Sequence, residues 1–221
     1  NRDKVLDDGT LVICFDLQQV ITTPRLFAGS AYYKRKPNEY QTKQGHCFVW
    51  TEAEANRGAN EIASCLTKFL WKADRTEQYQ RVVMYSDTCG GQNRNKIIIT
   101  AMLSFLSESS HIKVIEQKFF ESGHSHMECD TMHSAIESTY AKREVDIPAE
   151  LLMLMKLARK NQPYEVDEMT HEDIWDFGSL NSTAMSPSAF NGIMKCHYLR
   201  FDARGEGDPE VTMSEEIRGE A

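Results

Sequence analysis

The chain has 221 residues, of which 41% are hydrophobic, and its formal net charge is -8 at pH 7. This length suffices for one sizeable hydrophobic core, so we expect a single globular domain with a trailing segment. The acidic charge excludes a protein that coats nucleic acid by charge alone, because such binding needs clustered Lys and Arg.

The first part of the chain predicts three strands followed by a helix. Residues 10–22 read as a buried strand rich in Val, Ile and Phe that ends before Pro24, and residues 30–36 and 46–51 are two further strand candidates. Three successive strands joined by turns predict an antiparallel meander. Apolar residues then recur at helical spacing over residues 57–73, which predicts a helix.

The middle of the chain alternates predicted strands and helices. Because the later strands are joined through helices, we expect them to be parallel, with right-handed crossovers. The strands are predicted at residues 80–86 and 112–120, and the helices from Asn93 or Asn95 to Leu106, from Asp130 to about Arg143, and from Pro148 to about Lys160.

The predicted organisation is a catalytic core over residues 1–162, an extension over 163–201 that packs on it, and a loosely ordered acidic tail over 202–221. The extension contains a candidate helix start at Thr170 and a candidate strand at 193–201. The fold class that follows is α/β: a mixed sheet in which an antiparallel three-strand meander precedes parallel strands linked by helices.

Six scattered cysteines form no C-x-x-C pair, and several lie inside apolar runs. They read as reduced, mostly buried thiols of an intracellular protein, which we expect in the nucleus. No apolar stretch is long enough to span a bilayer and no signal-peptide pattern is present, so no membrane partner is expected. The first residue is not Met, which is consistent with a domain cut from a longer protein.

Three carboxylates occupy the ends of predicted elements. Asp16 closes the apolar run Leu11–Phe15, Asp87 closes the run Val82–Tyr85, and Asp130 opens a helix. Each has an ordinary explanation as a turn or cap residue. Together, in this chain order, they favour a site that holds Mg²⁺ or Mn²⁺ and activates water for attack on phosphate.

The sequence alone does not decide which residue is the third ligand of this site. On a helix from Asp130, positions 130, 133 and 137 lie near one face, so Asp130, His133 and Glu137 are all candidates. His124, just before the helix, is a candidate to bind metal, orient a water or touch phosphate. Cys129 hints at zinc, but a structural zinc site needs four ligands and the other cysteines form no matching pair.

Polar and basic residues flank the carboxylates. The turn Gly90-Gly91-Gln92-Asn93 lacks the G-x-x-x-x-G-K-[ST] pattern, so we do not expect P-loop nucleotide binding. Its glycines and amides can approach a metal-bound substrate, although a plain tight turn explains them equally well. Nearby basic residues can form a phosphate track or simply a solvated surface. The candidate nucleic-acid-binding residues are Lys34, Arg35, Lys36, Gln92, Asn93, Arg94 and Lys96.

Three segments, Phe15–Gln18, Tyr85–Asn93 and Gly123–Glu137, carry a family resemblance. The chain resembles the RNase H-like, transposase-derived domain carried by many uncharacterised, multicopy invertebrate proteins. The resemblance covers about residues 10–145, and its most specific motif is Ser-Asp-x-Cys-x-x-Gln-Asn at Ser86–Asn93. It implies a metal-dependent polynucleotidyl core whose acids fall on Asp16, Asp87 and either Asp130 or Glu137.

These patterns predict a Mg²⁺- or Mn²⁺-dependent nuclease or transposase-like domain that cleaves DNA phosphodiester bonds. Nucleic acid, DNA before RNA, is the expected partner, and a homo-oligomer is left open. One alternative is a domesticated, catalytically silent domain that serves as a nucleic-acid or protein interaction module. Another is a 3′–5′ exonuclease, which Gln18 disfavours because it stands where that motif has a second acid.

Overall fold

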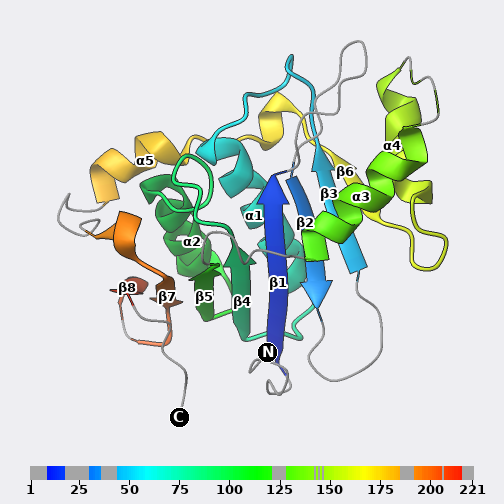
Figure 1. Ribbon diagram of the computed structural model, residues 1–221. Helices are drawn as coiled ribbons and strands as arrows, with labels where there is room; N and C mark the ends of the chain where they lie inside the picture. Colours follow the sequence, from blue (N-terminus) through cyan, green and yellow to red (C-terminus); the bar gives the residue numbers. More distant parts are fainter. Residues whose placement is uncertain are drawn as a thin grey trace.

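The computed structural model describes residues 9–17, 30–35, 44–120, 128–141, 143, 145, 147–184, 192–205 and 207–215. Within these residues, a single eight-stranded mixed sheet of strand order β6-β3-β2-β1-β4-β5-β7-β8 carries helices on both faces (Figure 1). The strands are β1 Thr10–Leu17, β2 Ser30–Arg35, β3 Gln44–Val49, β4 Arg81–Ser86, β5 Val114–Phe119, β6 Glu165–Glu168, β7 Tyr198–Asp202 and β8 Glu210–Ser214. The helices are α1 Ala59–Asp74, α2 Lys96–Glu108, α3 Glu128–Tyr140, α4 Pro148–Leu157 and α5 Phe177–Ala184.

The topology confirms the predicted α/β fold class. β1, β2 and β3 form the antiparallel meander, and β4 and β5 lie parallel to β1. α1 connects β3 to β4 and α2 connects β4 to β5, so helices link the parallel strands. At the edges, β6 is parallel to β3, β7 is antiparallel to β5, and β8 is antiparallel to β7.

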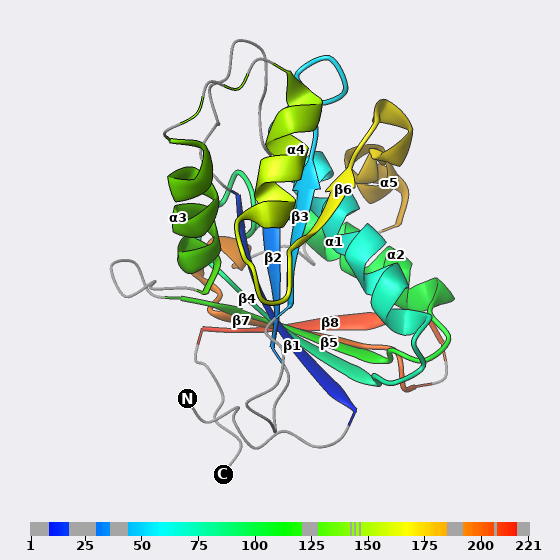
Figure 2. The same cartoon turned by 90° about the vertical axis from the view of Figure 1, so that its right-hand side faces the viewer.

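Alternate side chains of β1 face two different hydrophobic cores. Leu11, Ile13 and Phe15 pack in the larger core with α1 and α2, whereas Cys14 packs with Ile136 of α3 in the smaller one. Figure 2 shows α1 and α2 on one side of the sheet and α3 and α4 on the other. The even-numbered face of β1, which also includes Asp16, therefore lies toward α3.

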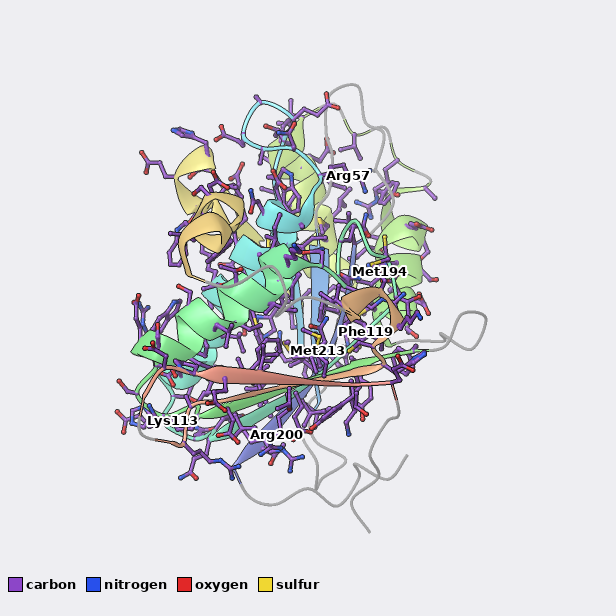
Figure 3. All side chains as sticks on the ribbon, turned by 90° about the vertical axis from the view of Figure 1, so that its left-hand side faces the viewer. Arg57, Lys113, Phe119, Met194, Arg200 and Met213 are labelled. Atoms are coloured by element: carbon purple, nitrogen blue, oxygen red, sulfur yellow. The ribbon has the colours of Figure 1, made fainter. Side chains whose placement is uncertain are left out.

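The side chains of the outer strands also alternate between the two faces of the sheet. Met213 of β8 packs on the larger core, and Arg200 of β7 lies on the opposite side of the sheet (Figure 3). There Oε1 of Glu116, a residue that is 2% exposed, lies 2.5 Å from Nη1 of Arg200 and 2.8 Å from Nη2 of Arg81. A buried carboxylate requires such partners, so these arginines have a structural role.

Helix boundaries agree with the sequence predictions to within a few residues. Asn95 caps α2, since its side-chain oxygen accepts a hydrogen bond from the backbone N–H of Ile98 at 3.1 Å. α3 begins at Glu128, so Asp130 lies in the first turn and is not the N-cap residue that we predicted. An acid in the first turn still interacts favourably with the helix dipole. None of the described helices is both long and apolar enough to cross a membrane.

The C-terminal third differs from the predictions. Residues 210–214, expected in a loosely ordered tail, form β8, and residues 165–168 form β6, which was not predicted. The last predicted strand begins at Tyr198, because Ile193–Lys195 is a single 3₁₀ turn. The predicted extension over 163–201 therefore contributes β6 and most of β7 to the core sheet.

The predicted helix at Thr170 is only one 3₁₀ turn long. The capping box is present, because the Thr170 backbone N–H donates to Oδ2 of Asp173 at 3.0 Å. The chain then becomes extended at Ile174, and the Trp175 backbone N–H donates to Oγ of Ser64 at 2.9 Å. This tertiary contact takes the chain out of the helix before α5 begins.

Asp74, the last residue of α1, joins that helix to the loop before β5. Its carboxylate accepts hydrogen bonds from the backbone N–H groups of Ser110, His111 and Ile112 at 3.1, 3.0 and 2.8 Å. Burial raises the pKa of Asp74, but these three donors outweigh burial and leave it below its usual value. We expect Asp74→Ala to lower the free energy of unfolding at pH 7 by about 2 kcal/mol, because buried donors lose their acceptor.

The pH dependence of this effect distinguishes it from loss of packing. A carboxyl group with a lowered pKa stabilises the fold above its unfolded pKa, and that stability is lost as the pH falls through the folded pKa. Urea unfolding at pH 7 and at pH 3 should therefore show a smaller difference between wild type and Asp74→Ala at the lower pH. A difference of equal size at both values would contradict this assignment.

Candidate metal centre

The carboxyl ends of β1 and β4 bring Asp16 and Asp87 to one edge of the sheet. The strands are parallel, and their last registered pair is Cys14 opposite Tyr85. Asp16 and Asp87 each follow that pair by two residues, so they end neighbouring strands at the same level. Because parallel strands place their carboxyl ends at the same edge, two apolar runs suffice to position these acids together.

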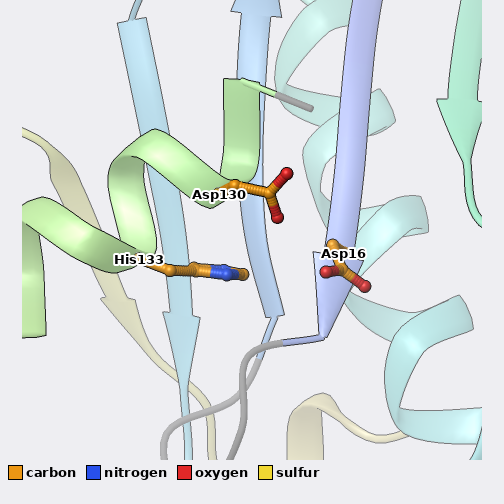
Figure 4. A group of neighbouring side chains, drawn as sticks. All are labelled: Asp16, Asp130 and His133. Atoms are coloured by element: carbon orange, nitrogen blue, oxygen red, sulfur yellow. The ribbon is translucent and has the colours of Figure 1, made fainter. Parts of the chain in front are cut away.

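The first turn of α3 brings two more candidates to the same place. Cys129 is fully buried and its Sγ lies 3.4 Å from Sγ of Cys14, which sets this turn against β1. Asp130 follows Cys129, and His133 lies about one turn later on the same helix face. Figure 4 shows Asp130 and His133 of α3 directed toward Asp16 at the end of β1.

Asp16, Asp130 and His133 form a three-ligand cluster. A carboxylate oxygen from each aspartate and a ring nitrogen of His133 all lie within 4.8 Å of one another, and all three residues are partly buried. One ion with ligand distances of about 2.0 to 2.6 Å can bridge such separations. Two carboxylates and one imidazole are ligands that suit Mn²⁺. Mg²⁺ prefers oxygen ligands, which the two carboxylates supply.

The electrostatics of Asp16 reflect this crowding of negative charge. Burial, then the charge of Asp87 and, to a smaller extent, that of Asp130, raise the pKa of Asp16 to about 6, although its hydrogen bond from the Leu17 backbone N–H at 2.8 Å opposes the shift. A divalent cation would relieve this repulsion. A proton or a divalent cation on Asp16 would therefore stabilise the cluster.

His133 offers a nitrogen that suits a metal ion. Its Nε2 is buried and has no hydrogen-bond partner among the described residues. Burial lowers the pKa of His133, and the charges of Asp130 and Glu137 only partly oppose that shift. The neutral imidazole, which is the form that coordinates metals, is therefore favoured at neutral pH.

Asp87 is held rigidly at the end of β4. Its Oδ1 accepts hydrogen bonds from the Cys89 backbone N–H at 3.0 Å and from Nδ2 of Asn93 at 2.6 Å. The sequence left the Asx-turn and metal-ligand readings as alternatives, but these bonds use Oδ1 and leave Oδ2 without a hydrogen-bond partner among the described residues. Asp87 can therefore form the Asx-turn through Oδ1 and still offer Oδ2 to a metal ion.

Asn93 belongs to the support of Asp87 and not to a nucleic-acid surface. It is 1% exposed, so the prediction that its amide contacts nucleic acid is wrong. Gln117 of β5, also fully buried, donates from Nε2 to the backbone oxygen of Asn93 at 3.1 Å and to Oγ of Ser86 at 3.2 Å. The sequence analysis did not identify Gln117 as a site residue. The signal that could have identified it is an amide side chain in the middle of a buried strand.

Glu137, the remaining third-ligand candidate, is not among the converging ligands. Glu137 is exposed and lies on α3 two turns beyond Asp130, outside the group whose ligand atoms converge. His124 lies outside the described residues. Of the three candidates on α3, the structure therefore brings Asp130 and His133 to Asp16, while Glu137 acts on the group through its charge near His133.

Among the basic residues of the predicted phosphate track, the structure describes the side chains of Arg94 and Lys96. Arg94 turns inward, with Nη1 donating to the Cys196 backbone oxygen at 3.2 Å and Cζ lying 5.7 Å from the ring centroid of Phe119. Gln92 is half-buried, and Lys96 is exposed at the start of α2. Lys34 and Arg35 belong to β2, but their side chains lie outside the described part of the chain, as does the whole of Lys36.

Comparison of the sequence with known protein families identifies one matching family. The sequence matches the family described as a domain of unknown function (DUF7869) over residues 39–216, a range that contains Asp87, Asp130 and His133 and begins after Asp16. A search of curated proteins finds no match. Because the matched range covers well over half of the 221 residues, the chain belongs to the DUF7869 family.

Proposed function

We propose that the chain is a divalent-metal-dependent nuclease or transposase-like domain that cleaves DNA phosphodiester bonds. The observation that carries this proposal is the convergence of Asp16, Asp130 and His133, with the charge of Asp87 acting on the same point. These acids stand at a strand end, a neighbouring strand end and a helix start, as the RNase H-like resemblance implies.

The residues present fit a divalent ion. His133 has a buried nitrogen that no group in the described part of the chain hydrogen-bonds, and Asp16 has a pKa raised by burial and by neighbouring acids. Asp16, Asp130 and His133 would hold the ion, with Asp87 beside them. When bound, Mg²⁺ or Mn²⁺ supplies Lewis acidity toward a phosphoryl oxygen and lowers the pKa of a coordinated water.

Other residues of the chain orient the candidate metal ligands. Asn93 and the Cys89 backbone N–H fix one oxygen of Asp87, so its carboxylate keeps one direction at the end of β4. Cys129 fixes the first turn of α3 against β1, which orients Asp130 and His133. Ligands held in this way need little reorganisation when substrate and metal arrive, which is how preorganised sites lower a reaction barrier.

The proposal is tested by Mn²⁺-dependent cleavage of end-labelled single-stranded and duplex DNA. We expect Asp130→Asn to lower the cleavage rate on the order of a hundred- to a thousandfold, because a charged group that stabilises the reacting centre is removed. Glu137→Gln, the matched change on the same helix outside the cluster, should retain the wild-type rate. Circular dichroism should show equal helix content in all three proteins.

Two results would count against the proposal. Loss of cleavage in Glu137→Gln with retention in Asp130→Asn would mean that the ligand set is wrong. A wild type that cleaves neither substrate, yet binds DNA with a steep salt dependence, would instead support the silent interaction module.

A further inference from the structure

Two cysteines from distant parts of the sequence meet beside the candidate metal centre. Cys14 lies on β1 and Cys129 on α3, and their Sγ atoms are 3.4 Å apart. They are 6% and 0% exposed, and both are in the thiol form in the structure, not joined by a disulfide. A disulfide bond is about 2.05 Å long, so the two sulfurs need to approach by a little more than 1 Å to become bonded.

The position of the pair couples it to the metal ligands. Cys14 precedes Asp16 by two residues on the same face of β1, and Cys129 directly precedes Asp130. His133 lies one turn further along the same helix. A bond between these sulfurs would therefore join the two elements that carry the three converging ligands.

We propose that Cys14 and Cys129 form a reversible disulfide, and that this bond weakens divalent-metal binding at the adjacent centre. The second half of the proposal rests on the proposed function. Metal–ligand distances in protein sites lie within about 0.2 Å of their standard values. The two sulfurs must approach by more than 1 Å, which is large compared with that range. We therefore expect the bond to shift the first turn of α3 relative to β1 and to move Asp130 and His133 from their positions beside Asp16.

The oxidant is a peroxide. One thiol sulfur attacks a peroxide oxygen and breaks the O–O bond, which gives a sulfenic acid and releases one water molecule. The second thiol sulfur then attacks the sulfenic sulfur, the S–O bond breaks, and a second water molecule leaves. Two thiols lose two electrons and two hydrogens in total, hydrogen peroxide accepts them, and a dithiol reductant reverses the reaction.

The first experiment asks whether the bond forms. The intact wild-type protein is treated with hydrogen peroxide, alkylated and digested without reduction, and the peptides are analysed by mass spectrometry. We expect a linked peptide pair containing Cys14 and Cys129 that disappears after dithiothreitol. Cys129→Ser should lose the pair, whereas Cys65→Ser, which changes a buried cysteine of α1 in the other core, should keep it. A wild type without this pair overturns the proposal.

The second experiment asks whether the bond acts on the centre. Mn²⁺ binding to the reduced and the oxidised wild type is measured by calorimetry, and we expect affinity about tenfold or more lower in the oxidised protein. Equal affinities would overturn the regulatory half of the proposal. If the reduced protein binds no Mn²⁺, the proposed metal function and the regulatory half both fail, while the linked peptide still decides whether the disulfide forms.

Discussion

Asp16→Asn is expected to raise the stability of the metal-free protein at pH 7 while lowering Mn²⁺-dependent cleavage on the order of a hundred- to a thousandfold. Cleavage falls because a converging ligand is weakened. Stability rises because the native Asp16 carboxylate is crowded: burial, Asp87 and Asp130 together raise its pKa to about 6. Asparagine has nearly the same shape and carries no charge into this acidic cluster.

The pH dependence of the stability follows from the sign of that shift. A carboxyl group whose folded pKa is raised stabilises the fold fully below its unfolded pKa, which is 3.8 for this residue, and loses that contribution as the pH rises through about 6. Asparagine does not titrate. The gain in the free energy of unfolding from Asp16→Asn should therefore be small near pH 4 and reach about 1 to 2 kcal/mol at pH 7, after allowance for solvent screening.

Urea unfolding in EDTA at pH 4, 5, 6 and 7 measures this difference. Glu172→Gln, which removes one exposed carboxylate far along the chain, is the control for the change in net charge. With saturating Mn²⁺ the order should reverse, because only the wild type gains the full binding free energy of the ion. A less stable metal-free Asp16→Asn at pH 7, or one with undiminished cleavage, would refute the role given to Asp16.

The central strands and their acids are predictable because two simple rules act together. The runs before Asp16 and Asp87 are continuously apolar, which is typical of strands buried on both faces. Parallel neighbours then place both carboxyl ends at one edge. The strands β6 and β8 lack such an apolar run: they are short edge strands that carry acidic residues and are only partly buried. Their sequences resemble loops, and only pairing with β3 and β7 makes them strands.

The third ligand was not predictable because helical periodicity gives a face but not a position along the axis. Asp130, His133 and Glu137 share one face of α3, yet Glu137 is seven residues, or about 10 Å along the helix axis, from Asp130. The contact between Cys129 and Cys14 sets which turn lies against β1. That contact spans 115 positions of the sequence, and no local pattern contains it.

The direction of the Asn93 side chain was likewise not predictable from the local sequence. An amide in a Gly-Gly-Gln-Asn turn can face solvent and substrate or turn inward, and the sequence does not distinguish the two. In the structure, Gln117 and the Cys89 carbonyl hold the turn so that Asn93 points to Asp87. The amide therefore acts on the site through Asp87 and not through nucleic acid.

Asn93→Ala is accordingly expected to lower Mn²⁺ affinity by about ten- to a hundredfold, the range found when a residue that orients a metal ligand is removed. Asp87 would lose the donor at 2.6 Å and keep only the Cys89 backbone N–H. Its carboxylate would then sample other directions at the end of β4. Calorimetric titration with Mn²⁺, at a temperature well below unfolding, measures the effect in folded protein.

Gln92→Ala provides the matched control, because Gln92 is the neighbouring amide of the same turn and donates nothing to Asp87 among the hydrogen bonds of the described residues. It should keep wild-type Mn²⁺ affinity even if its DNA cleavage falls. A purely structural role for Asn93 would lower the unfolding temperature and leave the affinity of the folded protein unchanged. Equal affinities in Asn93→Ala and wild type would thus remove Asn93 from the metal centre, whereas a selective loss would tie the Ser-Asp-x-Cys-x-x-Gln-Asn motif to positioning of Asp87.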